Sequence, residues 1–150
     1  MDENGKPDEA CVAALLFDAG FDGHRIDPAS LNGDRLHDDQ LLWIDLQGEV
    51  GLPAVLERNG VDLSLLRAAP AHSEGMVRAG DWTYLYAAAL RGDSGRRTNA
   101  EQLVVAIGDR ENIVVTAHAR PIGFLQALVE NEAEHLRAGL LHPASFAASL

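Results

Sequence analysis

The sequence is poor in cysteine, in aromatic residues and in long apolar runs. Cys11 is the only cysteine among 150 residues, which excludes an intrachain disulfide and a cysteine-based zinc cluster. Aromatic residues make up 5% of the chain, so the core must be built from Leu, Val, Ile and Ala. The apolar run at 12–17 is far shorter than the roughly 20 residues of a membrane-spanning helix. These absences predict a globular domain that lies outside the membrane.

Basic residues are also scarce. The chain has 12 Lys and Arg against 23 Asp and Glu, and the net charge of −11 predicts no nucleic-acid partner. Arg96-Arg97 is too short a basic segment to change this. The start Met1-Asp2-Glu3 lacks the basic residues of a signal peptide, so we expect the chain to be soluble and not secreted. The acidic surface should attract cations, although salt screens this attraction beyond about 10 Å at 0.1 M.

Sequence patterns typical of a cofactor or metal site are few. Neither phosphate-binding glycine pattern, GxGxxG or GxxxxGK[ST], occurs, and no HxxxH or HExxH places two histidines on one helix face. The densest group of ligand-type residues is His37-Asp38-Asp39. A loop with these residues could bind a divalent cation, magnesium or zinc, if further ligands came from elsewhere. The alternative, which we favour, is a loop exposed to solvent, and we predict no other cofactor.

Two features bear on catalysis. Gly92-Asp93-Ser94-Gly95 has the residues of a serine nucleophile segment, but Gly, Asp and Ser are also typical of a hairpin loop. His118 follows an apolar strand, where it is either a functional residue or part of the turn that leads to Pro121. We favour the turn in both cases and predict that the chain is not an enzyme.

Strand-like alternation and helical periodicity both occur along the chain. Strands are expected at 11–17, 25–26, 41–46, 74–79, 82–91, 101–107 and 113–118. Helices are expected at 52–59, 63–69, 122–138 and 143–150. The strand at 41–46 is apolar on both faces, which is typical of a strand covered on both sides. The predicted fold class is therefore α/β, with a mixed parallel and antiparallel sheet between two helix layers (α/β/α) and an antiparallel meander in residues 74–118.

A single domain is predicted. Residues 1–10 are polar and are expected to be flexible, and residues 11–142 form the α/β domain. The last predicted helix, 143–150, begins at Pro143 and reaches Leu150 without a helix-stop signal. We therefore expect the natural chain to continue past Leu150.

Four segments, in this order and at these distances, resemble a known family. They are Trp43-Ile44-Asp45-Leu46, the helix pair at 55–69, the strands at 101–108 and 112–121, and the helix entry at 136–139 with 143–150. Over residues 11–150 they resemble the N-terminal cytoplasmic domain of CorA-type magnesium and cobalt transporters and of their zinc-transporting relatives, the ZntB branch.

The resemblance implies a regulatory and assembly domain of a divalent-cation transporter on the cytoplasmic side of the inner membrane. Such a domain belongs to a homopentamer and continues, here at 143–150, into a stalk helix that precedes transmembrane helices and a Gly-Met-Asn pore motif. Neither the transmembrane helices nor that motif occurs in this sequence, so we expect the isolated domain to be monomeric or weakly associated. The alternative is a stand-alone binding module with the same fold.

Two neighbouring residues depart from the magnesium branch. The resemblance implies an acidic pair on the second short helix that contributes to a metal site between protomers, whereas the matching residues here are Arg67 and Ala68. A cationic guanidinium opposes a divalent ion, and a methyl group offers no ligand. We therefore do not expect magnesium to be sensed at this position.

Overall fold

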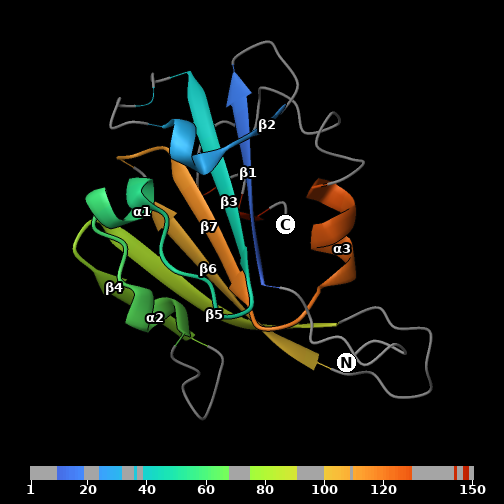
Figure 1. The fold of residues 1–150 in the computed structure, drawn as a ribbon. Coiled ribbons are helices and arrows are strands. Elements are labelled where there is room, and N and C mark those ends of the chain that lie inside the picture. Colours follow the sequence, from blue (N-terminus) through green and yellow to red (C-terminus); the bar gives the residue numbers. More distant parts are fainter. Residues whose placement is uncertain are drawn as a thin grey trace.

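The computed structural model describes residues 10–18, 24–31, 36, 39–67, 75–90, 100–108, 110–129, 144 and 147–148. These residues form the predicted α/β fold (Figure 1). The strands are β1 Cys11–Asp18, β2 His24–Ile26, β3 Gln40–Gln47, β4 Gly75–Ala79, β5 Trp82–Leu90, β6 Ala100–Gly108 and β7 Ile113–His118. The helices are the 3₁₀ helix η1 Pro28–Ser30 and the α-helices α1 Ala54–Arg58, α2 Leu63–Arg67 and α3 Gly123–Ala127.

These strands belong to one mixed sheet, in the order β2-β1-β3-β7-β6-β5-β4. β3 and β7 are parallel, whereas the other neighbouring pairs are antiparallel. The run from β4 to β7 is an antiparallel meander, which confirms the prediction for residues 74–118. Because β3 and β7 are parallel, their carboxyl ends lie at the same edge of the sheet, and the residues that follow them meet there.

The two parallel strands form the centre of the sheet and are buried on both faces. Alternate side chains of β3 enter two separate cores. Leu42 and Ile44 pack with α1 and α2, whereas Leu41 and Trp43 pack with α3. The helices accordingly cover opposite faces of the sheet (Figure 1), which confirms the predicted α/β/α layers and the two-sided burial of the strand at 41–46.

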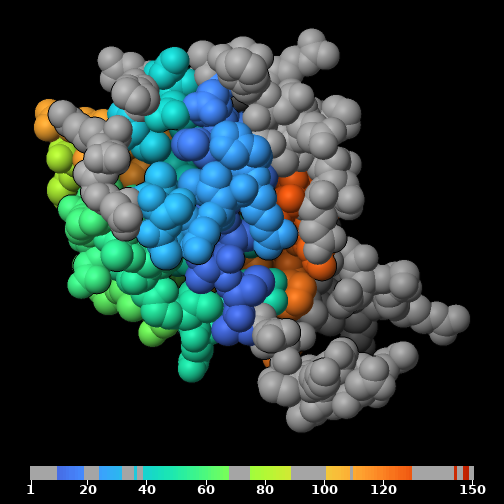
Figure 2. All heavy atoms as spheres, turned by 45° about the horizontal axis from the view of Figure 1, so that its top comes forward, coloured from blue at the N-terminus to red at the C-terminus, as the bar shows by residue number. Residues whose placement is uncertain are grey.

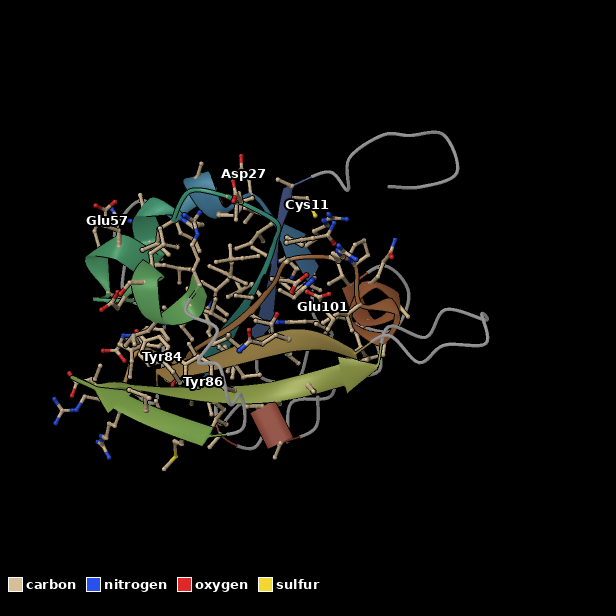
Figure 3. The ribbon with its side chains drawn as sticks, turned by 90° about the horizontal axis from the view of Figure 1, so that it is seen from below. Cys11, Asp27, Glu57, Tyr84, Tyr86 and Glu101 are labelled. Carbon is tan, nitrogen blue, oxygen red and sulfur yellow. The ribbon has the colours of Figure 1, made fainter. Side chains whose placement is uncertain are left out.

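Aromatic residues of β5 hold the segment that carries α1 and α2. The hydroxyl of Tyr84 accepts a hydrogen bond from the backbone N–H of Asp62 at 2.8 Å, and the hydroxyl of Tyr86 donates to the carbonyl of Leu65 at 2.8 Å. The indole of Trp82 bonds the carbonyl of the residue that follows α1, at 2.7 Å. Figure 3 shows Tyr84 and Tyr86 on the side of β5 that faces these helices. Polar atoms of the sheet therefore fix the position of a helix pair only five residues long in each member.

The ends of these elements follow local signals. Gly60 after α1 has φ of 80° and Gly80 in the β4–β5 turn has φ of 61°, a region open to glycine without steric cost. The carboxylate of Asp62 accepts from the N–H of Ser64 at 2.9 Å and so caps α2, as predicted. The prediction was wrong about the start of α1, which begins at residue 54 rather than 52, because the backbone of Pro53 is extended with ψ of 143°.

The opposite face is covered by α3, whose Leu125 is buried together with the preceding Ile122. Residues 128–129 continue α3 as a wider helical turn. The rest of the helix predicted at 122–138, and most of the one predicted at 143–150, lie outside the described residues. Figure 2 shows β2 and η1, in light blue, lying across the surface between the green α1–α2 segment and the orange α3.

Candidate functional site

A chain of hydrogen bonds joins β3 to β7 near their carboxyl ends. The indole Nε1 of Trp43 donates to Thr116 Oγ1 at 3.0 Å, and the Thr116 hydroxyl donates to Asp45 Oδ1 at 2.5 Å. Nε2 of His118 lies 3.0 Å and 3.1 Å from the two oxygens of the same carboxylate. These side chains share the α3 face because each strand contributes two residues, spaced two apart, and Asp45 is opposite Thr116 in the parallel register.

The directions of these bonds assign the charges. The Nδ1 atom of His118 lies 2.7 Å from the carbonyl oxygen of Arg120, which can only accept a hydrogen bond. Asp45 receives the Thr116 hydroxyl and the Nε2 atom, which fits an ionised carboxylate. Both ring nitrogens therefore face acceptors, and the geometry fits an imidazolium paired with a carboxylate. The side chains of this pair are 1% exposed for His118 and 10% for Asp45.

The environment favours the charged form of the imidazole. Burial alone would lower the pKa of His118, since it removes water from the cation. The hydrogen bond and charge of Asp45, the carbonyl of Arg120 and the charge of Glu101 outweigh burial, so the pKa of His118 lies above its ordinary value. The ion pair thus ties two central strands to the turn that leads into α3, which confirms the predicted role of His118 in that turn.

The same bonds restrict the chemistry of this group. A general base needs a ring nitrogen that can accept a proton from a nucleophile. Both nitrogens of His118 are already engaged, one by Asp45 and one by the Arg120 carbonyl, and the Thr116 hydroxyl is committed to Asp45. The arrangement therefore serves to hold strands together and gives no support for proton transfer.

A cavity of about 600 Å³ opens at the same edge of the sheet. This volume lies within the usual range for small-molecule sites, and the carboxyl ends of strands in α/β sheets are common ligand positions. Its walls come from the segments that follow β3 and β7, the start of β6, and α2. The apolar part of the lining consists of Leu46, Val50, Leu63, Leu66, Val104 and Ala117.

Charged and polar groups surround this apolar floor. They are Glu49, Arg67, Glu101, Gln102 and the buried His118. Figure 3 looks at the sheet from this edge and shows Glu101 in the region between the α1–α2 layer and α3. Arg67 donates from Nη2 to the carbonyl of Val50 at 2.5 Å, which links α2 to the chain that leaves β3.

The residues predicted as metal ligands are described only in part. Asp39 is exposed in the turn before β3, whereas His37 and Asp38 lie outside the described residues, as do Ser94 and Ala68. Within the described part of the chain no group of three or more His, Cys, Asp or Glu side chains could hold a metal ion. The metal site at His37-Asp38-Asp39 therefore stays a prediction.

Sequence reasoning missed Asp45 as a buried charge and missed the cavity. The pattern at 41–46 predicted an apolar strand and assigned no separate role to Asp45, although an acidic residue inside such a strand requires a partner. That partner lies 73 residues away along the chain, and only the pairing of β3 with β7 brings it close. The signal available in the sequence was the acidic residue itself.

No protein-family model and no curated protein matches this sequence. Solved structures do match it. The full-length CmaX protein is similar over 95% of this chain, with a TM-score of 0.69 and 14% identity, and the chain spans 44% of that protein. The cytoplasmic domain of ZntB from Vibrio parahaemolyticus is similar over 90% of this chain, with a TM-score of 0.57 and 11% identity, over 54% of the matched chain.

The soluble domain of CorA from Methanocaldococcus jannaschii is similar over 82% of this chain, with a TM-score of 0.56 and 17% identity. The chain spans 46% of that structure, and so covers about half of each of these three matched proteins. None of the helices that the structure describes has both the length and the apolar character to cross a bilayer. In its fold, the chain resembles the CmaX protein, the soluble domain of CorA and the cytoplasmic domain of ZntB. The likeness to CorA and ZntB is the one that the four sequence segments predicted.

Proposed function

We propose that this chain is the cytoplasmic regulatory and assembly domain of a CorA-type divalent-cation transporter, with a homopentamer as its assembled form. The similarity of fold to the CmaX, ZntB and CorA structures, over most of this chain, is the observation that supports the proposal. At 11–17% identity this similarity concerns the fold, so the transported ion and the assembly are part of the proposal.

The described structure offers a framework suited to such a role. Its central strands are joined by a buried ion pair, and the hydroxyls of Tyr84 and Tyr86 hold the α1–α2 layer to the sheet. The net charge of −11 would raise the local concentration of cations near a pore entrance, an effect that salt weakens. The His118–Asp45 pair gives no support for a catalytic role.

The proposal is tested on the product of the complete gene, reconstituted into liposomes that contain a fluorescent indicator for Mg²⁺ or Zn²⁺. Added cation should raise the indicator signal above that of protein-free liposomes. Removal of residues 11–142 should change the dependence of the flux on cation concentration. A gene without membrane-spanning segments, or a product that admits neither ion, would reject the transporter.

The second candidate is a stand-alone binding module with the same fold, favoured by the cavity at the carboxyl ends of β3 and β7. The complete gene separates the two candidates, because the module requires no membrane segments.

The metal site proposed at His37-Asp38-Asp39 is tested separately, by calorimetric titration of the chain with Mg²⁺ and Zn²⁺. Binding below millimolar concentration that is lost in a His37→Ala, Asp38→Asn double variant would support it. The absence of such binding would reject it.

A further inference from the structure

The cavity beside α2 contains polar atoms that the fold itself does not use. Nε2 of Gln102 is buried and has no hydrogen-bond partner among the described residues. Gln102 lies on β6 opposite Ala88 of β5, on the face that also carries Val104 and α2, and it lines the cavity. Buried amide groups are nearly always hydrogen-bonded, so the unpaired donor of this lining residue fits an acceptor on a ligand toward which the amide can turn.

The charges around the cavity are also unbalanced. Glu49 is exposed and Glu101 is partly buried, and neither forms an ion pair with another residue that the structure describes. The charge of Glu101 acts on His118, but the ring nitrogens of His118 are already bonded to Asp45 and the Arg120 carbonyl. Two glutamates therefore line the cavity without a cation bonded to either of them among the described residues.

Arg67 does not reverse this balance. Its guanidinium is exposed and already donates to the carbonyl of Val50. The His118–Asp45 pair is neutral as a unit, so among the described lining residues the two glutamates and Arg67 leave one net negative charge. The whole chain carries a net charge of −11, which adds a field that attracts cations and repels anions.

We infer that this cavity binds a small organic cation, a primary amine joined to a short apolar chain. The ammonium group pairs with Glu101 and, more weakly, with the exposed Glu49. The chain lies on the floor formed by residues such as Leu46, Leu66 and Val104. An acceptor on the ligand, such as a hydroxyl oxygen, receives the amide hydrogen of Gln102. The inference goes beyond the proposed transporter domain and does not depend on it.

Three probes of equal length separate charge from apolar contact: hexylamine, hexan-1-ol and hexanoate. An alkylammonium resembles a lysine side chain, with a pKa of about 10.4, so hexylamine is a cation at pH 7. Binding is followed by amide chemical shifts of the ¹⁵N-labelled chain. Hexylamine should shift the amides around Leu46, Gly48 and Ala117 and bind more tightly than hexan-1-ol, and hexanoate should not bind.

Matched variants identify the side chains that contact the ammonium group and the hydrogen-bond acceptor of the ligand. Glu101→Gln keeps the side-chain shape and should weaken hexylamine about fivefold, the upper end for a partly exposed ion pair. Glu57→Gln, on the exposed side of α1, should leave binding unchanged. The probe 6-aminohexan-1-ol should bind more tightly than hexylamine, and Gln102→Met should remove this difference.

An ammonium group also occurs on lysine side chains, so Nα-acetyllysine methylamide is titrated alongside. If Nα-acetyllysine methylamide binds more tightly than hexylamine, the site is assigned to a lysine side chain of a protein partner. If it binds more weakly, the site is assigned to a free amine. The inference is overturned if hexan-1-ol binds as tightly as hexylamine, if hexanoate binds more tightly, or if no probe shifts the amides around the cavity. Equal thermal melting of the variants and the parent shows that the binding changes are not due to unfolding.

Discussion

The two faces of the sheet are held to their helices in different ways. On the α1–α2 face, the neutral hydroxyls of Tyr84 and Tyr86 bond backbone atoms of the helix segment. On the α3 face, the link between the sheet and the turn before the helix passes through a buried ion pair, Asp45 with His118. The first kind of link does not change charge near neutral pH, whereas the second does so when His118 loses its proton, at a pKa above the ordinary value. The two helix layers should therefore respond differently to pH and to the loss of a single side chain.

The difference has an energetic basis. A neutral hydrogen bond contributes only about 0.5–1.5 kcal/mol net, because both partners were hydrated before folding. A buried ion pair carries large desolvation costs, so removing one partner leaves an unpaired charge and costs about 3–5 kcal/mol. The α3 face is thus the more sensitive of the two, even though the α-helical part of α3 is no longer than α1 or α2.

The largest effect is expected for Asp45→Leu. It leaves the buried imidazolium of His118 without its carboxylate, and the free energy of unfolding should fall by about 3 kcal/mol, the lower end for such a loss because Asp45 is slightly exposed. Urea unfolding followed by circular dichroism measures it. The double variant with His118→Leu should be more stable than Asp45→Leu alone, since the orphan charge is gone. If the two single effects simply add, the residues are not coupled.

The next effect is a loss of stability as pH rises. The folded-state pKa of His118 is raised above the unfolded value, so the folded chain keeps a proton that the unfolded chain releases. The stabilisation is complete below the unfolded pKa of about 6.5 and is lost as pH rises through the folded pKa, by at most about 1.4 kcal/mol per pH unit. The measurement is the urea midpoint between pH 5.5 and 9.

Two variants identify the source of this slope. His118→Gln should remove it from the profile, whereas His24→Gln, at an exposed position on the edge strand β2, should retain it. A wild-type profile that is flat, or that rises with pH in the same way as the His118→Gln profile, would show that the pair does not titrate in this range.

The sequence predicted the strands and layers of the fold better than it predicted the ion pair and the cavity. Period-two alternation located the strands, and the two-sided apolar pattern at 41–46 identified a central strand, because local side-chain chemistry decides both. The partners of Asp45 depend on the parallel pairing of β3 with β7, which joins residues 71 and 73 positions apart. No local pattern records that register, so the ion pair could not be predicted.

The cavity was missed for a related reason. Its walls combine the chain after β3, one helix turn of α2, and the facing ends of β6 and β7. Each segment is unremarkable by itself, and Glu101 and Gln102 read as an ordinary strand start. Only the sheet order places them beside α2. The turn-closing role of His118 was predictable, because Pro121 follows it by three residues and fixes where the strand must end.

The smallest effect is expected on the α1–α2 face of the sheet. Tyr86→Phe removes the donor to the carbonyl of Leu65, and the free energy of unfolding should fall by about 1 kcal/mol. Burial raises the pKa of Tyr86 above its ordinary value near 10, so the phenol stays neutral and the loss should be equal at pH 6 and pH 9. Hydrogen exchange should quicken in α2 while the β3–β7 amides remain protected, because the changed bond anchors only the α1–α2 layer. A loss that grows with pH, or faster exchange in β3, would mean that the two faces are coupled through the sheet and do not respond separately.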